Sequence, residues 1–255
     1  MTPDFWIVIP AYREAHRLPP YLRDLSRSLS SAPFTVTIQV VDDGSPPADL
    51  AALKSALADC ALETPLLTPL KTLAKNYGKG AAVKAGWDLA PAATPWIVFL
   101  DADGAIPAYE VLRVLSTVFI NRTPPRAYFG SRQRMLGRHI ERKLTRHLVG
   151  RVFATCVGTF INPHIYDSQC GFKCIPHAAY RLFRSQLLEP RFIFDVELLV
   201  LLLAQGVSIE EIPIDWTDIP GGKVRLLRDV PSMLLGLVRI RLRHFHGSET
   251  GRAAK

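Results

Sequence analysis

The sequence predicts an α/β fold in which a mostly parallel β-sheet is covered by helices on both faces. Three observations lead to this prediction. Apolar runs of strand length alternate with segments of helical periodicity between residues 5 and 120. Several of these runs are apolar at consecutive positions, as in strands that are buried on both faces of a parallel sheet. Two of them end abruptly in carboxylates, which is typical of the ligand-binding edge of such a sheet.

The elements of the first half follow from local patterns. FWIVIP, at 5–10, is predicted to be a buried strand that ends at Pro10. Leucines three or four residues apart place an apolar stripe on a helix over 18–29, with prolines in its first turn. TVTIQVVDDGS, at 35–45, is predicted to be a second strand that runs into a turn. The further elements expected in this half are a helix at 48–59, a proline-interrupted strand at 64–70, a helix at 81–90 and a strand at 96–104.

The second half begins with a helix expected at 107–120, after which the composition changes. Residues 127–153 are dense in Arg, Lys and His, with aliphatic side chains between them. Because no Gly/Ser-rich linker separates the halves, we expect one domain over 1–245, followed by a disordered tail at 246–255. The later elements expected are a return strand at 167–175, a helix at 194–206 and an alternating strand at 207–216.

Composition narrows the class of protein. A hydrophobic content of 48% in 255 residues excludes a disordered or fibrous chain. The net charge of +8 indicates a negatively charged partner: nucleic acid, anionic lipid or a phosphorylated substrate. Four cysteines fit reduced thiols of a cytosolic protein better than a disulfide scaffold. We see no secretory signal and no apolar run near the roughly 18 residues of a membrane span.

The run WIVFLDADGA ends in Asp101 and Asp103, which are one residue apart. In an extended backbone their carboxylates face the same way, roughly 6–7 Å apart. Oxygen ligands of this kind favour Mg²⁺ or Mn²⁺, commonly shared with the phosphates of a substrate. A D-x-D-G turn with no ligand is the alternative. Asp42 and Asp43, at the end of another strand, favour the binding site.

Two loops at the same predicted edge carry further candidates. NYGKGAA places Lys79 between two glycines just before a helix, where backbone amides could hold an anion or a ribose. It lacks the spacing of a Walker A loop, and an ordinary turn is the alternative. PAYREAHRL contains Tyr12 and Glu14 after the first strand, where they could contact a nucleobase or lie in a solvated loop.

These motifs, in this order, resemble the GT-A fold of family 2 glycosyltransferases, a Rossmann-like architecture. The resemblance runs from about residue 5 to residue 245, and the C-terminal half resembles the dolichyl-phosphate β-glucosyltransferases within that family. The segments that carry this closer resemblance are DSQCGFK at 167–173, FDVELL at 194–199, EIPIDWTDIPGGKV at 211–224 and RIRLRH at 239–244.

The resemblance implies an inverting, metal-dependent hexosyltransferase that transfers one sugar to a polyprenyl or dolichyl phosphate. The favoured donor is UDP-glucose; GDP-mannose, UDP-N-acetylglucosamine or a soluble acceptor remain open. It also implies a nucleotide-binding half at 1–105 and an acceptor-side half at 106–245. In the implied single displacement, an acceptor phosphate, largely a dianion at neutral pH, attacks the anomeric carbon with little help from a general base.

The resemblance also implies roles for individual residues. Those at the nucleotide would be Pro10, Ala11, Tyr12, Glu14, Asp42, Asp43, Asn76, Lys79, Asp101 and Ala102. Asp101 and Asp103 would bind the Mg²⁺ or Mn²⁺ ion. Those at the acceptor phosphate would be Ser131, Arg132, Arg142, Lys143 and Arg146. Gln169 and Lys223 would lie near the donor sugar and its phosphates. The catalytic residues would be Asp103, Arg132, Asp195 and Glu197.

Two departures from the family pattern concern the substrate contacts and the membrane. Gly222 stands before Lys223 where the family usually has Ser, so one hydroxyl contact is missing. The eukaryotic glucosyltransferases carry an N-terminal membrane anchor, whereas this sequence starts at the first strand. Membrane contact is therefore expected from elsewhere.

Two basic segments with apolar residues between the charges fit helices at the cytoplasmic surface of a membrane. One includes Arg138, Arg142, Lys143, Arg146 and Arg151. The other starts at Asp229 as N-cap and includes Met233, Leu234, Leu237, Arg239, Leu242 and Arg243. A basic outer face over the core is the alternative, and RIRLRH also fits a strand.

Two rival protein classes fit the sequence poorly. A nucleic-acid-binding protein would interleave its basic runs with aromatic side chains, whereas here the intervening residues are aliphatic. We therefore expect no nucleic-acid partner. A sugar-nucleotide pyrophosphorylase would need a Gly- and Arg-rich phosphate loop after the first strand, and PAYREAHRL contains no glycine.

Overall fold

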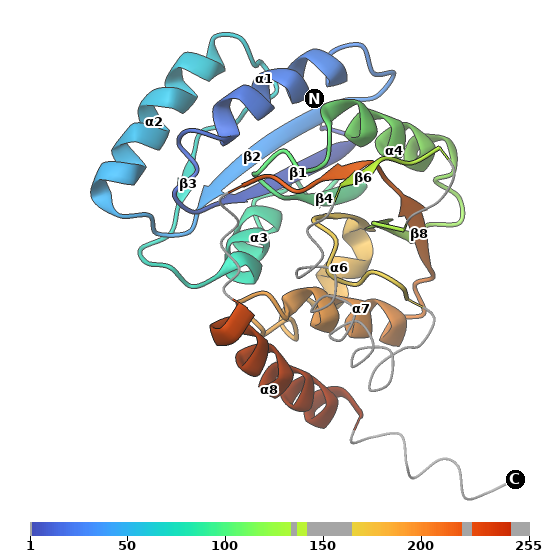
Figure 1. Cartoon of the computed structure of the whole chain (residues 1–255). Coiled ribbons are helices and arrows are strands. Elements are labelled where there is room, and N and C mark those ends of the chain that lie inside the picture. The colour runs from blue at the N-terminus through green and yellow to red at the C-terminus, as the bar shows by residue number, and fades with distance from the viewer. Residues whose placement is uncertain (1, 134–136, 142–164, 221–225, 246–255) are drawn as a thin grey trace, which may run out of the picture.

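A seven-stranded sheet with helices on both faces forms the centre of the computed structural model, which describes residues 2–133, 137–141, 165–220 and 226–245 (Figure 1). The strand order is β3-β2-β1-β4-β7-β5-β8, and the predicted mostly parallel α/β fold is confirmed.

The sheet consists of β1 (Phe5–Ala11), β2 (Val36–Asp42), β3 (Lys71–Thr72), β4 (Trp96–Leu100), β5 (Ala127–Ser131), β7 (Phe172–Pro176) and β8 (Ile209–Pro213). A separate parallel pair joins β6 (Ile140–Glu141) to β9 (Trp216–Thr217). The helices are α1 (Leu18–Leu29), α2 (Pro47–Ala61), α3 (Lys79–Trp87), α4 (Ala108–Ile120), α6 (His177–Phe183), α7 (Phe194–Ala204) and α8 (Leu226–Phe245).

The direction of the strands decides which loops meet. β1 pairs in parallel with β2 on one side and with β4 on the other. The strands up to β3 are added on one side of β1, and β4 is added on its other side, so the strand order reverses between β1 and β4. β7 is antiparallel to both β4 and β5, so β5 runs in the same direction as β4. The carboxyl ends of β1, β2, β4 and β5 therefore meet at one edge, with the start of β7 among them.

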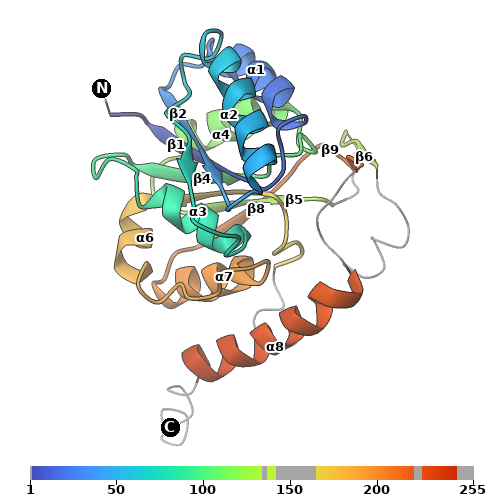
Figure 2. The ribbon, with the colours of Figure 1, turned by 90° about the vertical axis from the view of Figure 1, so that its left-hand side faces the viewer.

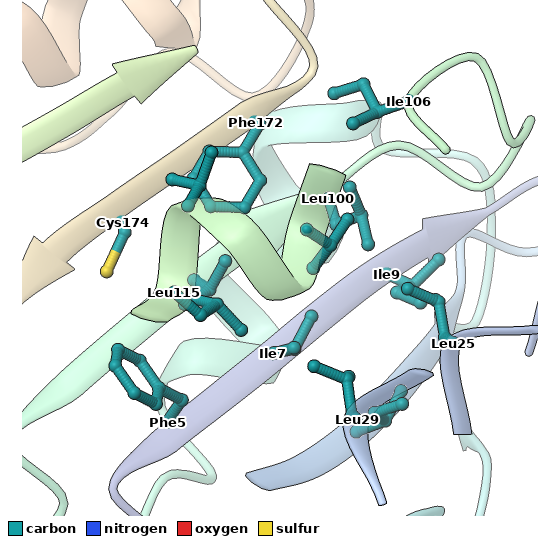
Figure 3. Packing of buried hydrophobic residues seen from close by; sticks show 14 of the residues in the cluster. Phe5, Ile7, Ile9, Leu25, Leu29, Leu100, Ile106, Leu115, Phe172 and Cys174 are labelled. Atoms are coloured by element: carbon teal, nitrogen blue, oxygen red, sulfur yellow. The ribbon is translucent and has the colours of Figure 1, made fainter. Parts of the chain in front are cut away.

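Side chains alternate between the two faces of the sheet, and each face has its own core. On one face Phe5, Ile7 and Ile9 of β1 pack with Leu115 of α4 and with residues of α1 (Figure 3). The core on the other face, which α3, α6 and α7 cover, includes Trp6, Val8, Ile97, Phe99, Phe129, Val83, Trp87, Tyr180, Phe194 and Leu198. Helices are therefore required on both faces, because both are apolar.

Helix α8 packs on α7, on the side remote from the sheet (Figures 1 and 2). Leu237 and Ile240 of α8 are buried against Ile193, Val196 and Val200. The outer side of α8 is also apolar, with Leu234, Leu235, Val238 and Leu242 exposed. The apolar residues of this segment thus lie on two opposite sides of one helix.

Several boundaries differ from the sequence-based expectations. The strand expected at 64–70 forms an isolated bridge between Leu67 and Ile38, and the paired strand comes after Pro69, at Lys71–Thr72. The helix expected at 81–90 begins at Lys79 and ends at Trp87. The strand expected at 207–216 is divided into β8 and β9, which belong to different sheets. Helix α6 and strands β5 and β6 were not predicted.

The C-terminal segment also corrects two expectations. RIRLRH lies inside α8 and is helical, so the strand alternative is wrong. Asp229 is not the N-cap, because the helix already begins at Leu226. The part of the first basic segment from Arg142 onward and the expected disordered tail at 246–255 lie outside the described residues. Within the part of the chain that the structure describes, no helix is both long and apolar enough to cross a membrane.

Candidate functional site

The candidate site lies beyond the carboxyl ends of β1 and β4, where the strand order of the sheet reverses. Open α/β sheets bind ligands at this position because the loops diverge there. Asp101 directly follows β4, and its backbone N–H donates to the carbonyl of Gly171, just before β7. Ser131 ends β5 at the same edge, and Arg132 follows it. The sheet therefore brings together Asp101 and Arg132, which are 31 residues apart in the chain.

Asp101 and Asp103 form the acidic centre of this edge. Burial raises the pKa of Asp103, and the neighbouring charge of Asp101 raises it further. The Ala105 N–H, which donates to Asp103 Oδ1 at 3.1 Å, opposes that shift. A Cβ atom at Gly171 would overlap Asp101 Oδ2, so glycine leaves the room that this carboxylate occupies. The pair is therefore an anionic site whose two charges repel each other.

Lys79 supplies the nearest cation. Its Nζ lies 3.1 Å from Asp101 Oδ1 and 3.6 Å from Asp195 Oδ2. Burial lowers the pKa of Lys79, but the two carboxylates outweigh it and keep that pKa above its ordinary value. The resemblance implies that Lys79 lies at the nucleotide together with Asp42 and Asp43; in the structure its ammonium group pairs with Asp101 and Asp195.

Asp42 and Asp43 organise the backbone beside the site. Asp43 accepts hydrogen bonds from the N–H groups of Tyr77 and Gly78, at 2.8 and 2.9 Å. Burial raises the pKa of Asp43, and these two donors oppose the shift. Asp42 accepts from the Ser45 N–H at 2.9 Å. Asn76 lies against Gly44, whose positive φ of 64° and lack of a side chain permit this close approach.

The loop after β1 contains the other residues that the sequence assigned to the nucleotide. Ala11 is buried, while Pro10 and Tyr12 are partly exposed. Ala102, between the two acids of the centre, is also buried. Glu14 is buried and forms a two-pronged ion pair with Arg17. Arg17 is in turn close enough to Asp103 and Asp101 for their charges to raise its pKa.

Arg132 forms a two-pronged ion pair with Asp167. Both contacts, Nε to Oδ2 and a terminal guanidinium nitrogen to Oδ1, measure 2.7 Å. The guanidinium also lies over the Trp216 ring, 5.5 Å from its centroid. Burial lowers the pKa of Arg132, but Asp167 more than compensates, and Asp101 contributes to the net increase. Arg132 is therefore a fixed cation on the Asp101 side of the edge.

Buried polar atoms without a hydrogen-bond partner gather among the predicted site residues. Within the described part of the chain, seven such side-chain atoms occur. Three of them are Asp42 Oδ1, Ser131 Oγ and Gln169 Nε2. Leaving a buried polar group unpaired costs roughly 1–3 kcal/mol. A carboxylate acceptor, a hydroxyl that can donate or accept, and an amide donor therefore favour binding of a polar ligand.

Asp195 and Glu197, both predicted to act at the reacting sugar, are placed differently. They are two residues apart in the first turn of α7, and side chains at that spacing point to different sides of a helix. Asp195 faces Lys79 and Lys173. Glu197 accepts from the N–H groups of Leu188 and Glu189, at 2.7 and 2.6 Å. The structure does not bring Glu197 together with the acidic centre.

Glu197 instead helps to hold α8. Arg243 donates to Glu197 Oε1 at 3.0 Å, and His244 Nε2 lies 3.3 Å from the same oxygen. Glu189 completes the cluster by accepting two hydrogen bonds from Arg239, at 3.0 and 2.7 Å. Two buried carboxylates thus fix the basic side of α8 to the start of α7.

The sequence analysis did not single out some residues that lie at the candidate site. Other predicted site residues lie outside the described part of the chain. Lys173, Asp167 and Arg17 contact or neighbour site residues but were not singled out. Asp167 and Lys173 lie within the quoted DSQCGFK segment, so that segment was the available signal. Arg142, Lys143, Arg146 and Lys223 lie outside the described residues.

A metal ion at this edge would have to share its ligands with a substrate. Among the described residues no group of three or more His, Cys, Asp and Glu side chains could hold a metal. Asp101 and Asp103 provide two carboxylates, and Mg²⁺-type sites commonly use one or two carboxylates with substrate phosphates and water.

Comparison with known proteins identifies relatives over most of the chain. The family model described as "Glycosyl transferase family 2" matches residues 6–188. The dolichyl-phosphate β-glucosyltransferase of Saccharomyces cerevisiae is 32% identical, with 94% of this chain and 75% of that protein covered. The human protein of the same name is also 32% identical, with coverages of 97% and 78%.

Solved structures show the same fold at low identity. Glucosyl-3-phosphoglycerate synthase from Mycobacterium tuberculosis, in complex with Mn²⁺, UDP and glucosyl-3-phosphoglycerate, gives a TM-score of 0.65 at 13% identity. The match covers 95% of this chain and 80% of that one. Mannosyl-3-phosphoglycerate synthase from Rubrobacter xylanophilus gives a TM-score of 0.68 at 14% identity, with coverages of 99% and 77%.

Replacing Glu197 by Gln is expected to destabilise the protein. The change removes the negative charge that Arg243 and His244 contact and weakens the acceptor for two buried N–H groups. We expect a loss of roughly 1–3 kcal/mol in the free energy of unfolding, measured by urea denaturation. Glu210→Gln is the matched control, because its ion pair with Arg126 is partly exposed and should cost less than about 1 kcal/mol. An E197Q variant as stable as the wild type would contradict the structural role.

Replacing Asp103 by Asn is expected to stabilise the metal-free protein at pH 7. Because the folded-state pKa of Asp103 is raised, its ionisation opposes folding at pH values above its unfolded-state pKa. The melting temperature should rise by roughly 2–4 °C for each kcal/mol relieved. The gain should shrink as the pH falls through the raised folded-state pKa and disappear below the unfolded-state pKa of ~3.9, where the carboxyl is protonated in both states. Asp24→Asn, at an exposed ion pair, should change little; a D103N gain that is independent of pH would refute this explanation.

Proposed function

Because the chain belongs to glycosyltransferase family 2, we propose that it transfers one glucose residue from UDP-glucose to dolichyl phosphate or another polyprenyl phosphate. It is a glycosyltransferase, and its sheet has the GT-A architecture of the solved neighbours. The named relatives that are dolichyl-phosphate β-glucosyltransferases support the choice of sugar and acceptor. We also propose one catalytic domain over 1–245, with the donor half at 1–105 and the acceptor half at 106–245.

The observation that carries the proposal is the meeting of Asp101 and Asp103 with Lys79 and Arg132 at one edge of the sheet. The reaction brings a diphosphate and a phosphate close together, so the site must balance several negative charges. Lys79 lies 3.1 Å from Asp101, and Arg132 is near enough for Asp101 to raise its pKa. Two fixed cations beside the carboxylate pair, both near Asp101, meet that requirement.

Asp101 and Asp103 fit a divalent cation. Both offer carboxylate oxygens, and burial together with the charge of Asp101 raises the pKa of Asp103, costs that a cation between them would relieve. The solved neighbours include complexes with Mn²⁺ and with Mg²⁺. We propose that Asp101 and Asp103 hold Mg²⁺ or Mn²⁺, which would stabilise the departing diphosphate as a Lewis acid.

The nucleotide is proposed to lie between the loop after β1 and the end of β2. Asp42 Oδ1 is a buried acceptor without a protein partner, which suits an N–H donor of a nucleobase. Tyr12 offers an aromatic face in the neighbouring loop, and its ring contacts the Arg13 guanidinium at 5.4 Å. The Glu14–Arg17 ion pair holds that loop at its base.

The acceptor phosphate is proposed to approach the end of β5. Ser131 Oγ is a buried hydroxyl without a partner, and Arg132 is the adjacent cation. An oxygen of the phosphate attacks the anomeric carbon, and the bond from that carbon to the diphosphate oxygen breaks. Attack opposite the leaving group inverts the anomeric configuration. Because the nucleophile is already anionic at neutral pH, these residues orient it and need not remove a proton.

Membrane contact is proposed for the outer side of α8. Leu234, Leu235, Val238 and Leu242 are 41%, 63%, 56% and 52% exposed, although aliphatic side chains gain by leaving water. Arg239, half exposed, borders this stripe. A basic helix with an exposed apolar stripe binds the interface of anionic lipid. The enzyme would then sit on the cytoplasmic face of the membrane and take its lipid acceptor from there.

A transfer assay tests the donor, acceptor and metal together. UDP-[¹⁴C]glucose with dolichyl phosphate and Mn²⁺ should give label that extracts into organic solvent. EDTA should abolish the transfer, and Asp103→Ala should lower kcat/KM by roughly 100-fold or more, since it removes charge stabilisation at the diphosphate.

The comparison arms of the assay decide between substrates. GDP-mannose and UDP-N-acetylglucosamine should give little label, and so should 3-phosphoglycerate as a soluble acceptor. Asp24→Asn, remote from the site, should retain wild-type activity. Undiminished transfer in EDTA would refute the metal, and faster transfer to a soluble acceptor would refute the lipid substrate.

A flotation assay tests the surface of α8. The double variant Leu235→Asp/Val238→Asp should bind vesicles of phosphatidylcholine and phosphatidylserine at least tenfold more weakly, because each buried side chain contributes roughly 1.5–3 kcal/mol. Leu182→Asp, at an exposed leucine of α6, is the matched control and should bind like the wild type. Equal flotation of all three proteins would contradict membrane docking through α8.

A further inference from the structure

Lys173 lies fully buried in the middle of the sheet. On β7 it stands directly opposite Phe99 of β4 and Phe129 of β5. Its Nζ lies 5.4 Å from the centroid of the Phe99 ring and 5.1 Å from that of Phe129. The side chain is 0% exposed. A buried ammonium group costs several kcal/mol unless it is paired, so its partners determine what it does.

Asp195 is the partner of Lys173. Lys173 Nζ lies 2.5 Å from Asp195 Oδ1 and donates a hydrogen bond to the Cys170 carbonyl at 2.7 Å. Asp195 itself is 1% exposed, in the first turn of α7. Its other oxygen, Oδ2, faces Lys79 at 3.6 Å. Asp195 is therefore shared between two lysines.

Lys79 is shared in the same way between two carboxylates. Its Nζ is nearer to Asp101, at 3.1 Å, than to Asp195, at 3.6 Å. Charges thus alternate along one continuous row: Lys173, Asp195, Lys79 and Asp101. Lys79 Nζ thus lies at Asp101 Oδ1, a carboxylate oxygen that could otherwise bind a divalent cation.

We propose that Lys173 is a positioning residue which, by neutralising Asp195, holds Lys79 on Asp101 as an internal counterion that competes with the divalent cation. Lys173 lies on the apolar side of the row and acts through Asp195 and Lys79. The inference rests on the proposed function in one respect, namely that Asp101 and Asp103 bind a divalent cation.

Two variants should change Mn²⁺ affinity in opposite directions. Lys173→Met leaves Asp195 without its cation, so Asp195 should draw Lys79 away from Asp101 and free that carboxylate for Mn²⁺. In Lys173→Met/Asp195→Asn the charge of Asp195 is gone as well, so Lys79 should remain on Asp101. The double variant removes one positive and one negative charge, so its net charge equals that of the wild type. Long-range attraction of Mn²⁺ is therefore unchanged, and the two proteins differ in the position of Lys79.

The test is a titration of the purified full chain with Mn²⁺ alone, with free Mn²⁺ followed by electron paramagnetic resonance. We expect K173M to bind Mn²⁺ more tightly and the double variant more weakly than the wild type, each by roughly three- to tenfold, as for charges coupled in one network. If K173M does not fold, the double variant decides by itself. Lys84→Met, which removes a lysine of α3 that donates to the Leu187 carbonyl, is the control for loss of a positive charge.

A third background shows whether the effect passes through Lys79. In Lys79→Met, the double change at 173 and 195 should leave Mn²⁺ affinity unaltered. A double variant with wild-type affinity, an effect that persists in the K79M background, or a K84M variant that matches K173M would overturn the inference. A wild-type chain that binds no Mn²⁺, alone or with UDP, would instead refute the proposed metal site itself.

Discussion

Charge balance at the carboxyl edge of the sheet is the constraint on which the rest of the structure depends. Parallel packing brings the ends of β1, β2, β4 and β5 together, and with them the acids that follow these strands. Uncompensated carboxylates at a half-buried edge oppose folding. The chain offsets them with Lys79 on Asp101, Arg132 on Asp167 and Arg17 on Glu14. Two of these cations, Lys79 and Arg132, would also balance the phosphate charges in the proposed transfer.

Helix α7 connects this edge to the outer surface of the molecule. Its first turn directs Asp195 to the lysines under the acidic centre and Glu197 to the arginine and histidine of α8. The helix that carries the exposed apolar stripe is therefore attached to the same turn that supports the site. If α8 binds the membrane, α7 sets the distance from the lipid surface to the acidic centre, because α7 packs against α8 and its first turn contacts Lys79.

The comparisons with known proteins show that one fold occurs in proteins with different names. Neighbours at 13–14% identity share the sheet and are named glucosyl- or mannosyl-3-phosphoglycerate synthase, whereas relatives at 30–32% identity are named dolichyl-phosphate β-glucosyltransferase. The acidic pair after β4 lies at the carboxyl edge of the shared sheet. The DSQCGFK segment leads into β7 and supplies both Asp167 and Lys173, so it joins the ion pair of Arg132 to that of Asp195.

The sequence by itself determined the α/β class, the order of most elements, and the acids at the ends of two strands, because periodicity and strand ends are local properties. It could not assign partners. Asp195 and Glu197 have the same local surroundings, yet one lies beside Lys79 and the other holds Arg243, since side-chain direction matters only once neighbours are fixed. The same holds for α8: only the structure shows which of its two apolar sides α7 covers and which side is exposed. In the sequence, Lys173 is an ordinary polar residue of a predicted strand. It becomes a buried cation because β7 pairs with β4 and β5 and is covered by α7. Burial of this kind depends on contacts between segments distant in the chain.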